Sequence, residues 1–297
     1  MSTRRFTTTD GFVVVDLDDA PVSFGIIRSA PKVLVDGATW LARSQTYQFA
    51  AFGRRASGAS GAVNAPVDEK AAAIGAAVTE LSGDDWSTVH LVAGRGVGAA
   101  DLEPLRERDP RPSDWFARRD EFVVAGFIAA AERVTGGLSG TRVAVEEFDA
   151  TGPLLAAALA AAGATVVEVD ESLGADAVLR ADADLLFAGS KVGLIGDQLV
   201  PHVRVRTIVP SGPMPVTAKA LAALARAGTV VLPDFLTTAG HLAAWPEDGS
   251  STDPAALVAD RLATVLDHER GPLVGACELA EDFLSSWTTI PFGRPIA

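Results

Sequence analysis

Four arginines near a segment of very small residues are the side chains best suited to bind a ligand. Arg54 and Arg55 precede the segment SGASGAV, and Arg43 and Arg95 could gather beside it. A guanidinium keeps its charge at any working pH and can bind a carboxylate or phosphate through two parallel hydrogen bonds. The pattern predicts an anion site, although a solvated loop would carry the same arginines, so both interpretations stay open.

The residues that could act as nucleophiles or metal ligands lack the spacing that such chemistry needs. Ser57 and Ser60 lie in the small-residue segment without a base nearby in sequence, and serine is a common turn former. The single cysteine, Cys277, excludes a disulfide framework and a thiolate metal cluster. Neither G-x-S-x-G nor the P-loop pattern occurs. The histidines are scattered without ligand spacing, so we expect no metal site; they are His90, His202, His241 and His268.

The sequence VAVEEFDATG contains the turn where a dinucleotide-binding protein would carry its phosphate-binding glycines. That fingerprint needs glycine for the tight turn, for the approach of the pyrophosphate and for helix packing. Here the three positions hold Glu147, Asp149 and Gly152, so only the packing glycine is present. Asp170 could accept a ribose hydroxyl, although an acid at a strand end is common. Because two carboxylates would repel a pyrophosphate, NAD(P) binding through Gly152 and Asp170 is predicted to be weak or absent.

Composition and charge limit the possible partners. A formal net charge of −13 over 297 residues argues against a nucleic-acid-binding protein, whose footprint is basic. No apolar run reaches the length of a membrane span, and the N-terminus lacks the apolar core of a signal peptide. With 48% hydrophobic residues the chain can bury a large core, and its length favours two domains. These features predict a soluble, cytoplasmic protein that binds neither nucleic acid nor a membrane.

The first part of the chain must position the arginines and the small-residue segment. Residues 11–16 and 21–28 have the pattern of two strands joined by a polar turn, which predicts a hairpin. Asp36 could be the N-cap of a helix that ends before the small-residue segment SGASGAV. We interpret that segment as a loop. An alanine-rich helix over 68–81 follows. A polar segment with three prolines then places the inter-domain link near residue 120.

Strands and helices alternate after residue 122. Residues 141–170 have the pattern of a strand, a helix and a second strand, and three further apolar strands lie in ADADLLFAG, RVRTIVPSG and AGTVVLPDF. Such alternation predicts a doubly wound parallel sheet. Helices over 254–269 and 273–287 close the chain.

Five segments, in order and with compatible spacing, resemble the glutamate, leucine, phenylalanine and valine dehydrogenases. FGIIR looks like the G-G-x-R strand of that family, and LARSQTYQFAAFGRRASGASGAVNAP is similar to its helix and glycine loop. LVAGRGVGAADL resembles the family's T-A-E-D-V-G-T segment. VPSGPMPVTAKALAAL and VVLPDFLTTAGHLAAW resemble its G-A-N-x-P-x-T-x-E-A and V-V-P-D-x-x-x-N-A-G-G patterns.

The resemblance implies an α/β fold with two domains. A substrate-type domain would comprise residues 1–121 plus 271–297, and a Rossmann-like doubly wound parallel sheet would span 122–270, with a cleft between them. The family oxidises an amino acid with NAD(P) to an imine, which is hydrolysed to a 2-oxo acid. Two lysines and an aspartate carry this chemistry, and members are usually homo-oligomers.

The residues that carry the family's chemistry are replaced in this chain. Its carboxylate-binding lysine falls on Gln48, its catalytic lysine on Ser60, and its aspartate on Gly96, or on Gly94 if the alignment slips by two. Arg28 is retained, in a role that the resemblance suggests is structural. Since general acid–base assistance is worth roughly 10²–10⁴ in rate for each group, standard oxidative deamination should be crippled.

The sequence leaves three functions open. The cleft could bind an amino-acid- or oxo-acid-like anion, with or without new chemistry. Alternatively, the chain could be an active NAD(P)-dependent oxidoreductase on an unusual amino acid, with Arg54, Arg55 or Arg95 supplying the missing positive charge. It could also be a non-catalytic partner subunit. The family's nucleotide-side asparagines fall on Pro213 and Thr238, which agrees with the loss of the cofactor fingerprint.

Overall fold

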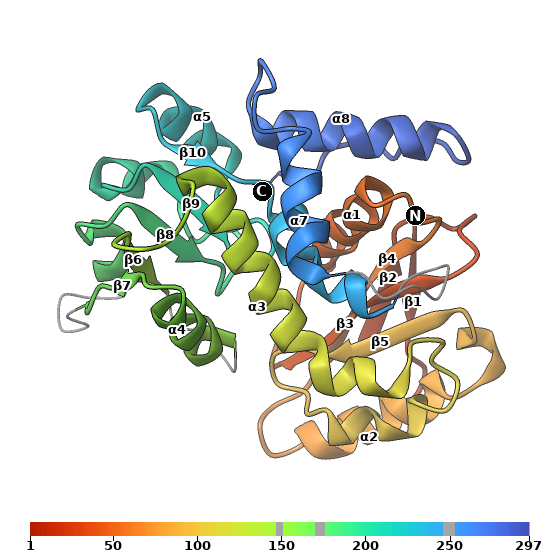
Figure 1. Cartoon of the computed structure of the whole chain (residues 1–297). Helices are drawn as coiled ribbons and strands as arrows, with labels where there is room; N and C mark the ends of the chain where they lie inside the picture. Colours follow the sequence, from red (N-terminus) through yellow and green to blue (C-terminus); the bar gives the residue numbers. More distant parts are fainter. Residues whose placement is uncertain (147–150, 170–175, 246–252, 297) are drawn as a thin grey trace. The chain divides into compact units, whose positions relative to one another are not determined.

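A computed structural model of the chain describes residues 1–146, 151–169, 176–245 and 253–296 (Figure 1). The chain forms two compact units. Unit 1 comprises Met1–Arg111 and Leu279–Pro295, and unit 2 comprises Pro112–Glu278 and Ile296–Ala297. The predicted link near residue 120 lies inside helix α3 (Ser113–Thr135), whereas the units change at Arg111–Pro112. Each unit contains its own sheet, so the α/β class with two domains is confirmed.

Unit 1 is built on a five-stranded mixed sheet with the order β1-β2-β4-β3-β5. Its strands are β1 (Ser2–Arg5), β2 (Gly11–Val15), β3 (Ser23–Ala30), β4 (Ser57–Asn64) and β5 (Val89–Ala93). Strand β2 is antiparallel to β1 and β4, and β3 is parallel to β4 and β5. The predicted hairpin of 11–16 with 21–28 is therefore wrong, because β4 lies between those strands. Strand β1, a partner of β2, has the polar sequence STRR, as an edge strand can have, so the apolar pattern did not reveal it as a strand.

Helices α1 (Val35–Ala51) and α2 (Lys70–Leu81) cover opposite faces of this sheet (Figure 1). Phe12 and Val14 pack with α1, whereas the alternate residues Val13 and Val15 pack in the cluster that includes α2. Because both faces are covered, β2 is apolar throughout. Two short 3-10 helices, Asp84–Trp86 and Ala100–Leu105, flank β5 in the sequence. The N-cap is Leu34 and not Asp36. Asp36 lies in the first turn of α1, where a carboxylate interacts favourably with the helix dipole.

The small-residue segment is a central strand and not a loop. Gly58 of β4 lies against α1 so closely that a Cβ there would overlap the Ala42 carbonyl oxygen and lie 2.7 Å from the Thr46 nitrogen. The Thr46 hydroxyl accepts the Gly58 N–H at 2.9 Å. A Cβ at Gly61 would lie 2.9 Å from Ile27 Cγ1. The small residues therefore let a helix and a neighbouring strand approach the β4 backbone directly.

Unit 2 contains a five-stranded sheet with the order β10-β9-β8-β6-β7, and all of its strands are parallel. Its strands are β6 (Arg142–Val145), β7 (Thr165–Val166), β8 (Leu185–Ala188), β9 (Thr207–Pro210) and β10 (Val230–Val231). The predicted doubly wound parallel sheet is confirmed. Strand β7 lies on one side of β6, and the later strands β8, β9 and β10 are added on its other side. The order in which strands are added to the sheet therefore reverses between β6 and β8.

The helices of unit 2 are α3, α4 (Thr151–Ala161), α5 (Ala218–Arg226), α6 (Asp234–Thr237), α7 (Pro254–Ala263) and α8 (Pro272–Ser285), whose last residues belong to unit 1. Among its described residues, unit 2 also contains the 3-10 helices Ala177–Arg180, Asp197–His202 and Thr238–Ala244. Helix α3 packs against α7 and the last of these 3-10 helices. A Cβ at Gly240 would overlap the Phe122 carbonyl oxygen, so this glycine permits the close crossing.

Candidate functional site

Arg28 and Ser60 lie on one face of the unit 1 sheet. Arg28 of β3 is in register with Ala62 of β4, which packs in the core beneath α1, so Arg28 and Ser60 both belong to the α1 side. The Arg28 Nη2 atom donates to Ser60 Oγ at 3.4 Å. Ser60 is fully buried, whereas Arg28 is half-buried at the carboxyl end of its strand. The structure therefore places one cation beside the position where the resemblance puts the catalytic lysine.

The charge of Arg28 has no counter-ion among the described residues. Burial lowers the pKa of its guanidinium below the ordinary value, and no neighbouring charge contributes to that shift. Its Nε atom is buried and has no hydrogen-bond partner in the described part of the chain. Since a buried donor without a partner is costly and a carboxylate matches guanidinium geometry, this arrangement suits an anionic ligand.

Both positions that align with the family's aspartate leave little room for a side chain in this backbone. Gly96 has φ +83°, and a Cβ there would overlap the Ser29 carbonyl oxygen of β3. At Gly94, a Cβ would lie 2.9 Å from Arg28 Cγ and 3.1 Å from the Ile27 oxygen. The turn after β5 is therefore shaped for glycine. Gln48, at the other lysine position, is buried in α1.

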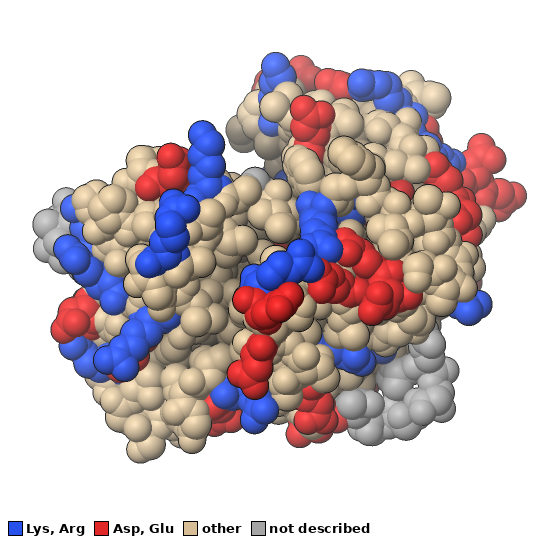
Figure 2. Space-filling model, turned by 90° about the horizontal axis from the view of Figure 1, so that it is seen from above, with Lys and Arg blue, Asp and Glu red and all other residues tan. Residues whose placement is uncertain are grey.

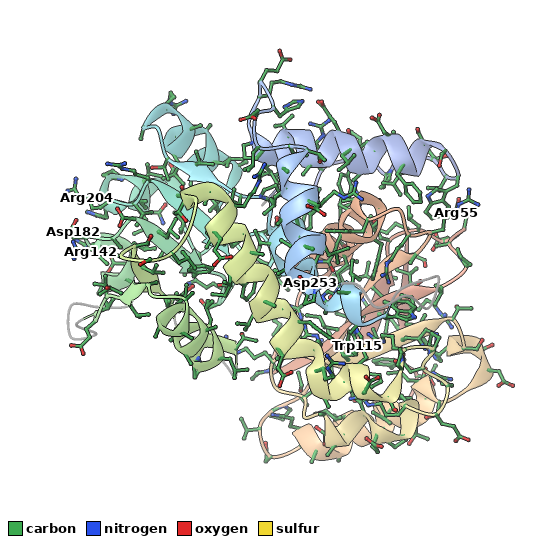
Figure 3. The ribbon with its side chains drawn as sticks, in the orientation of Figure 1. Arg55, Trp115, Arg142, Asp182, Arg204 and Asp253 are labelled. Atoms are coloured by element: carbon green, nitrogen blue, oxygen red, sulfur yellow. The ribbon has the colours of Figure 1, made fainter. Side chains whose placement is uncertain are left out.

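The four arginines predicted to gather around an anion are used differently. Arg43 is buried and paired with Asp16, with its Nε 2.8 Å from both carboxylate oxygens, so it is not available to a ligand. Arg54 is buried, and Arg55 and Arg95 are exposed. Figure 3 shows Arg55 at the outer edge of unit 1. The arginine beside Ser60 is Arg28, and the signal for it in the sequence was that it is the only charged residue in the strand SFGIIRSA.

His90 of β5 is a buried histidine whose ring stacks on Phe24, with 5.3 Å between ring centroids. Burial lowers its pKa from 6.5 to about 4; Asp109 opposes this shift, while Arg111 and Arg108 add to it. Asp109 itself is held by Arg111, whose Nε donates to its carboxylate at 2.8 Å. His90 is therefore neutral at neutral pH and belongs to the core of unit 1.

We expect the stability of unit 1 to fall as the pH falls from about 6.5 to about 4. In that range the unfolded chain binds a proton at His90 that the folded chain rejects, which lowers the free energy of unfolding by about 3 kcal/mol at most. Urea unfolding of the wild type and of His90→Phe, each at several pH values, measures the contribution of His90 to the free energy of unfolding. His202→Gln, at a partly exposed histidine, is the matched control. Equal pH slopes for wild type and His90→Phe would contradict the expectation.

In unit 2, Glu146 immediately follows β6 and bridges to the segment after β8. Its Oε2 atom accepts the backbone N–H of Gly189 at 3.0 Å and that of Ser190 at 3.2 Å, and its Oε1 accepts the Ser190 hydroxyl. Gly152 is buried at the start of α4. Glu147, Asp149 and Asp170 lie outside the described residues. At this described end of the sheet, a carboxylate therefore occupies the backbone N–H groups of Gly189 and Ser190.

The two family-like segments in the second half of the chain meet at Asp234. Its Oδ2 atom accepts the N–H of Met214 at 3.0 Å, and the Met214 carbonyl accepts the Gly193 N–H at 2.9 Å. Met214 is a buried non-glycine residue with φ +45°, a strained conformation that these two contacts hold. Of the positions expected to hold asparagine, Pro213 precedes this strained residue, and the Thr238 hydroxyl bonds the Asp234 carbonyl at 2.8 Å.

Other classes of site find no support in the described residues. These residues contain no group of three or more His, Cys, Asp or Glu side chains placed to hold a metal ion. None of the helices they form is long and apolar enough to span a membrane. Figure 2 shows acidic and basic side chains interspersed over the face that it draws.

Solved structures with this architecture match almost the whole chain. L-tryptophan dehydrogenase from Nostoc punctiforme aligns with a TM-score of 0.67 and 17% identity, over 96% of this chain and 95% of that chain. The hetero-hexameric glutamate dehydrogenase from Thermus thermophilus gives a TM-score of 0.74 at 17% identity, over 95% and 86%. Plasmodium falciparum glutamate dehydrogenase gives 0.70 at 11% identity, over 97% and 82%.

The chain therefore has the fold of the amino acid dehydrogenases, with a Rossmann-like unit, as the sequence resemblance implies. No protein-family model and no curated protein matches the sequence.

Proposed function

We propose that this protein uses the amino acid dehydrogenase fold to bind an amino-acid- or oxo-acid-like anion in unit 1, and that NAD(P)-dependent oxidative deamination is lost. The observation that carries the proposal is the Arg28 guanidinium, half-buried beside Ser60, without a counter-ion among the described residues and with an unused Nε–H. A ligand carboxylate on Arg28 would supply the missing charge. Other chemistry on the bound anion is compatible with this site.

The residue types around Arg28 favour binding over proton transfer. An arginine holds its proton at working pH, so it can orient a carboxylate but is a poor acid or base. Ser60 is a hydroxyl where the family places a lysine, and the backbone at Gly96 leaves no room for an aspartate. Deamination needs groups that gain and lose protons near neutral pH. The face of the sheet around Arg28 and Ser60 offers a clamp for an anion, and the family's proton-transfer groups are replaced.

A second candidate function is that of a non-catalytic partner subunit. The glutamate dehydrogenase from Thermus thermophilus with the same fold is hetero-hexameric, so this architecture occurs in assemblies of unlike chains. A chain that binds an anion without turning it over could serve such an assembly. Oligomer formation, as a homo-oligomer or with an unlike chain, is part of this proposal.

Isothermal titration with pyruvate, 2-oxoglutarate, L-alanine and L-glutamate tests the binding proposal. We expect at least one to bind with a Kd between about 1 μM and 1 mM, and Arg28→Met to weaken that binding at least about tenfold, or 1.4 kcal/mol. The same variant should raise the free energy of unfolding by about 1 kcal/mol without ligand, because it removes a buried donor that has no described partner. Opposite effects on binding and stability identify a binding residue.

Arg55→Met and Arg95→Met are the matched controls, since both arginines are exposed cations of unit 1. We expect them to leave binding and stability unchanged. Weaker binding in either control, with Arg28→Met unaffected, would move the anion site to the arginines predicted from the sequence. Turnover of L-glutamate with NAD or NADP by wild type would contradict the loss of deamination.

A further inference from the structure

In unit 2, the carboxyl ends of β6 and β8 are the location where the topology of the sheet predicts a ligand site. These two parallel strands are neighbours in the sheet, and the direction of strand order reverses between them. In open parallel sheets, ligands bind outside the carboxyl ends of the strands at such a reversal. The residues at this edge therefore decide which ligand the unit accepts.

Successive backbone N–H groups at this edge converge on one point. Those of Gly189 and Ser190 both reach Glu146 Oε2, at 3.0 and 3.2 Å, and the Ser190 hydroxyl reaches Oε1 of the same carboxylate. Consecutive N–H groups that point into one concavity bind anions. These donors bind the Glu146 carboxylate, which is part-buried.

The neighbouring strand leaves another polar group at this edge. Ser211 follows β9, and its N–H donates to the Ala188 carbonyl at 3.0 Å. Its hydroxyl is buried and has no hydrogen-bond partner within the described residues. A Cβ at Gly189 would overlap the Gly212 nitrogen, so the two turns are in backbone contact. The donors are thus held in place by the packing of one turn on the next.

We propose that Gly189 and Ser190 form an anion-binding site that the chain fills with its own Glu146 carboxylate, and that this site takes a small carboxylate or a phosphate once Glu146 is removed. A tethered carboxylate has a high effective concentration at its own receptor, so a free anion at millimolar concentration competes poorly. The pyrophosphate of a dinucleotide would likewise have to compete with the Glu146 carboxylate for these N–H groups. Glu146 thereby closes this end of the sheet to phosphate ligands, independently of the anion proposed for Arg28 in unit 1.

Chemical rescue of Glu146→Ala tests the inference on the full chain. Thermal unfolding is followed in sodium chloride, formate, acetate and phosphate at equal ionic strength. The variant should melt about 5 °C or more below wild type in chloride, given that roughly 2–4 °C corresponds to each kcal/mol in a chain of this size class. Formate or phosphate should restore at least half of that loss with a saturable dose dependence. A response to formate and acetate alone identifies a carboxylate site, and a response to phosphate identifies a site for phosphate ligands.

Two further variants make the test specific. Glu146→Gln fills the same space without the charge, so it should lose stability and gain no response to formate. Glu132→Ala removes an exposed carboxylate of α3 and should match wild type in every salt. If Glu146→Ala does not fold in chloride, refolding from urea should give a higher yield in formate. A melting temperature or yield that is the same in all four salts would overturn the proposal.

Discussion

Gly58→Val is expected to prevent unit 1 from folding. A Cβ at this position would overlap the Ala42 carbonyl oxygen and lie 2.7 Å from the Thr46 nitrogen and 2.8 Å from Gln45 Cβ, all atoms of α1. Backbone atoms inside a helix cannot move aside singly, so α1 would have to leave β4 and expose the core around Phe12 and Val14. Such overpacking at a backbone contact exceeds the usual 1–3 kcal/mol, and we expect a loss of about 4 kcal/mol or more.

Urea unfolding followed by circular dichroism measures this effect, with Gly75→Ala as the matched control. Gly75 is an exposed residue of α2, and a Cβ there would meet nothing within 4 Å. Alanine at this position should stabilise the helix by about 0.5–1 kcal/mol. If Gly58→Val unfolded within about 1 kcal/mol of wild type, α1 and β4 could not be in the contact described here.

Arg43→Met is expected to destabilise unit 1 by about 3–5 kcal/mol. The side chains of Arg43 and Asp16 are 3% and 0% exposed, and three nitrogen–oxygen distances of 2.8 Å join them. Removal of the guanidinium leaves the Asp16 carboxylate buried without its partner, which is the costly way to break a buried ion pair. Arg43 also donates to the carbonyl groups of Phe292 and Gly293, so the variant additionally loosens the C-terminal segment of unit 1.

The double variant Asp16→Leu with Arg43→Met separates these two contributions. Apolar replacement of both members of a buried pair is often nearly neutral, so most of the lost stability should return. What does not return measures the contacts to the C-terminal carbonyl groups. Arg142→Met is the surface control, because Arg142 and Asp182 pair with 48% and 91% of their side chains exposed (Figure 3), and should cost at most about 1 kcal/mol. A loss no larger in Arg43→Met than in this control would contradict the expectation.

The fold class could be predicted because it depends on patterns that are local in the sequence. Short apolar strands that alternate with helices after residue 122 specify a parallel sheet, whichever strands pair. The errors occurred where pairing partners mattered. The segment SGASGAV has Val63 as its single β-branched residue, and its place in the centre of the sheet depends on contacts with Gly25, Ile27 and α1. Propensity alone made it a loop, and tertiary packing makes it β4.

In the candidate site, too, the sequence showed which residue types are present, and the tertiary structure decided which of them meet. The absence of lysine at Gln48 and Ser60 is visible in the sequence, and so is the absence of the phosphate-turn glycines. Sequence proximity favoured Arg54 and Arg55 as the replacement charge, because both adjoin the small-residue segment. The structure places Arg28, 32 residues from Ser60, beside it instead. Register between parallel strands decides this contact, and no local pattern specifies a register.

The sequence by itself determined the fold class, the absence of the family's lysines and aspartate, and the negative net charge. These are properties of residue types and their period along the chain. Only the tertiary structure decided that Arg43 pairs with Asp16 while the Arg28 Nε–H has no partner among the described residues. It also decided that Glu146 occupies the N–H groups of Gly189 and Ser190, 43 and 44 residues away. Whether a charge is available to a ligand depends on which groups surround it, and strands that are distant in sequence supply those groups.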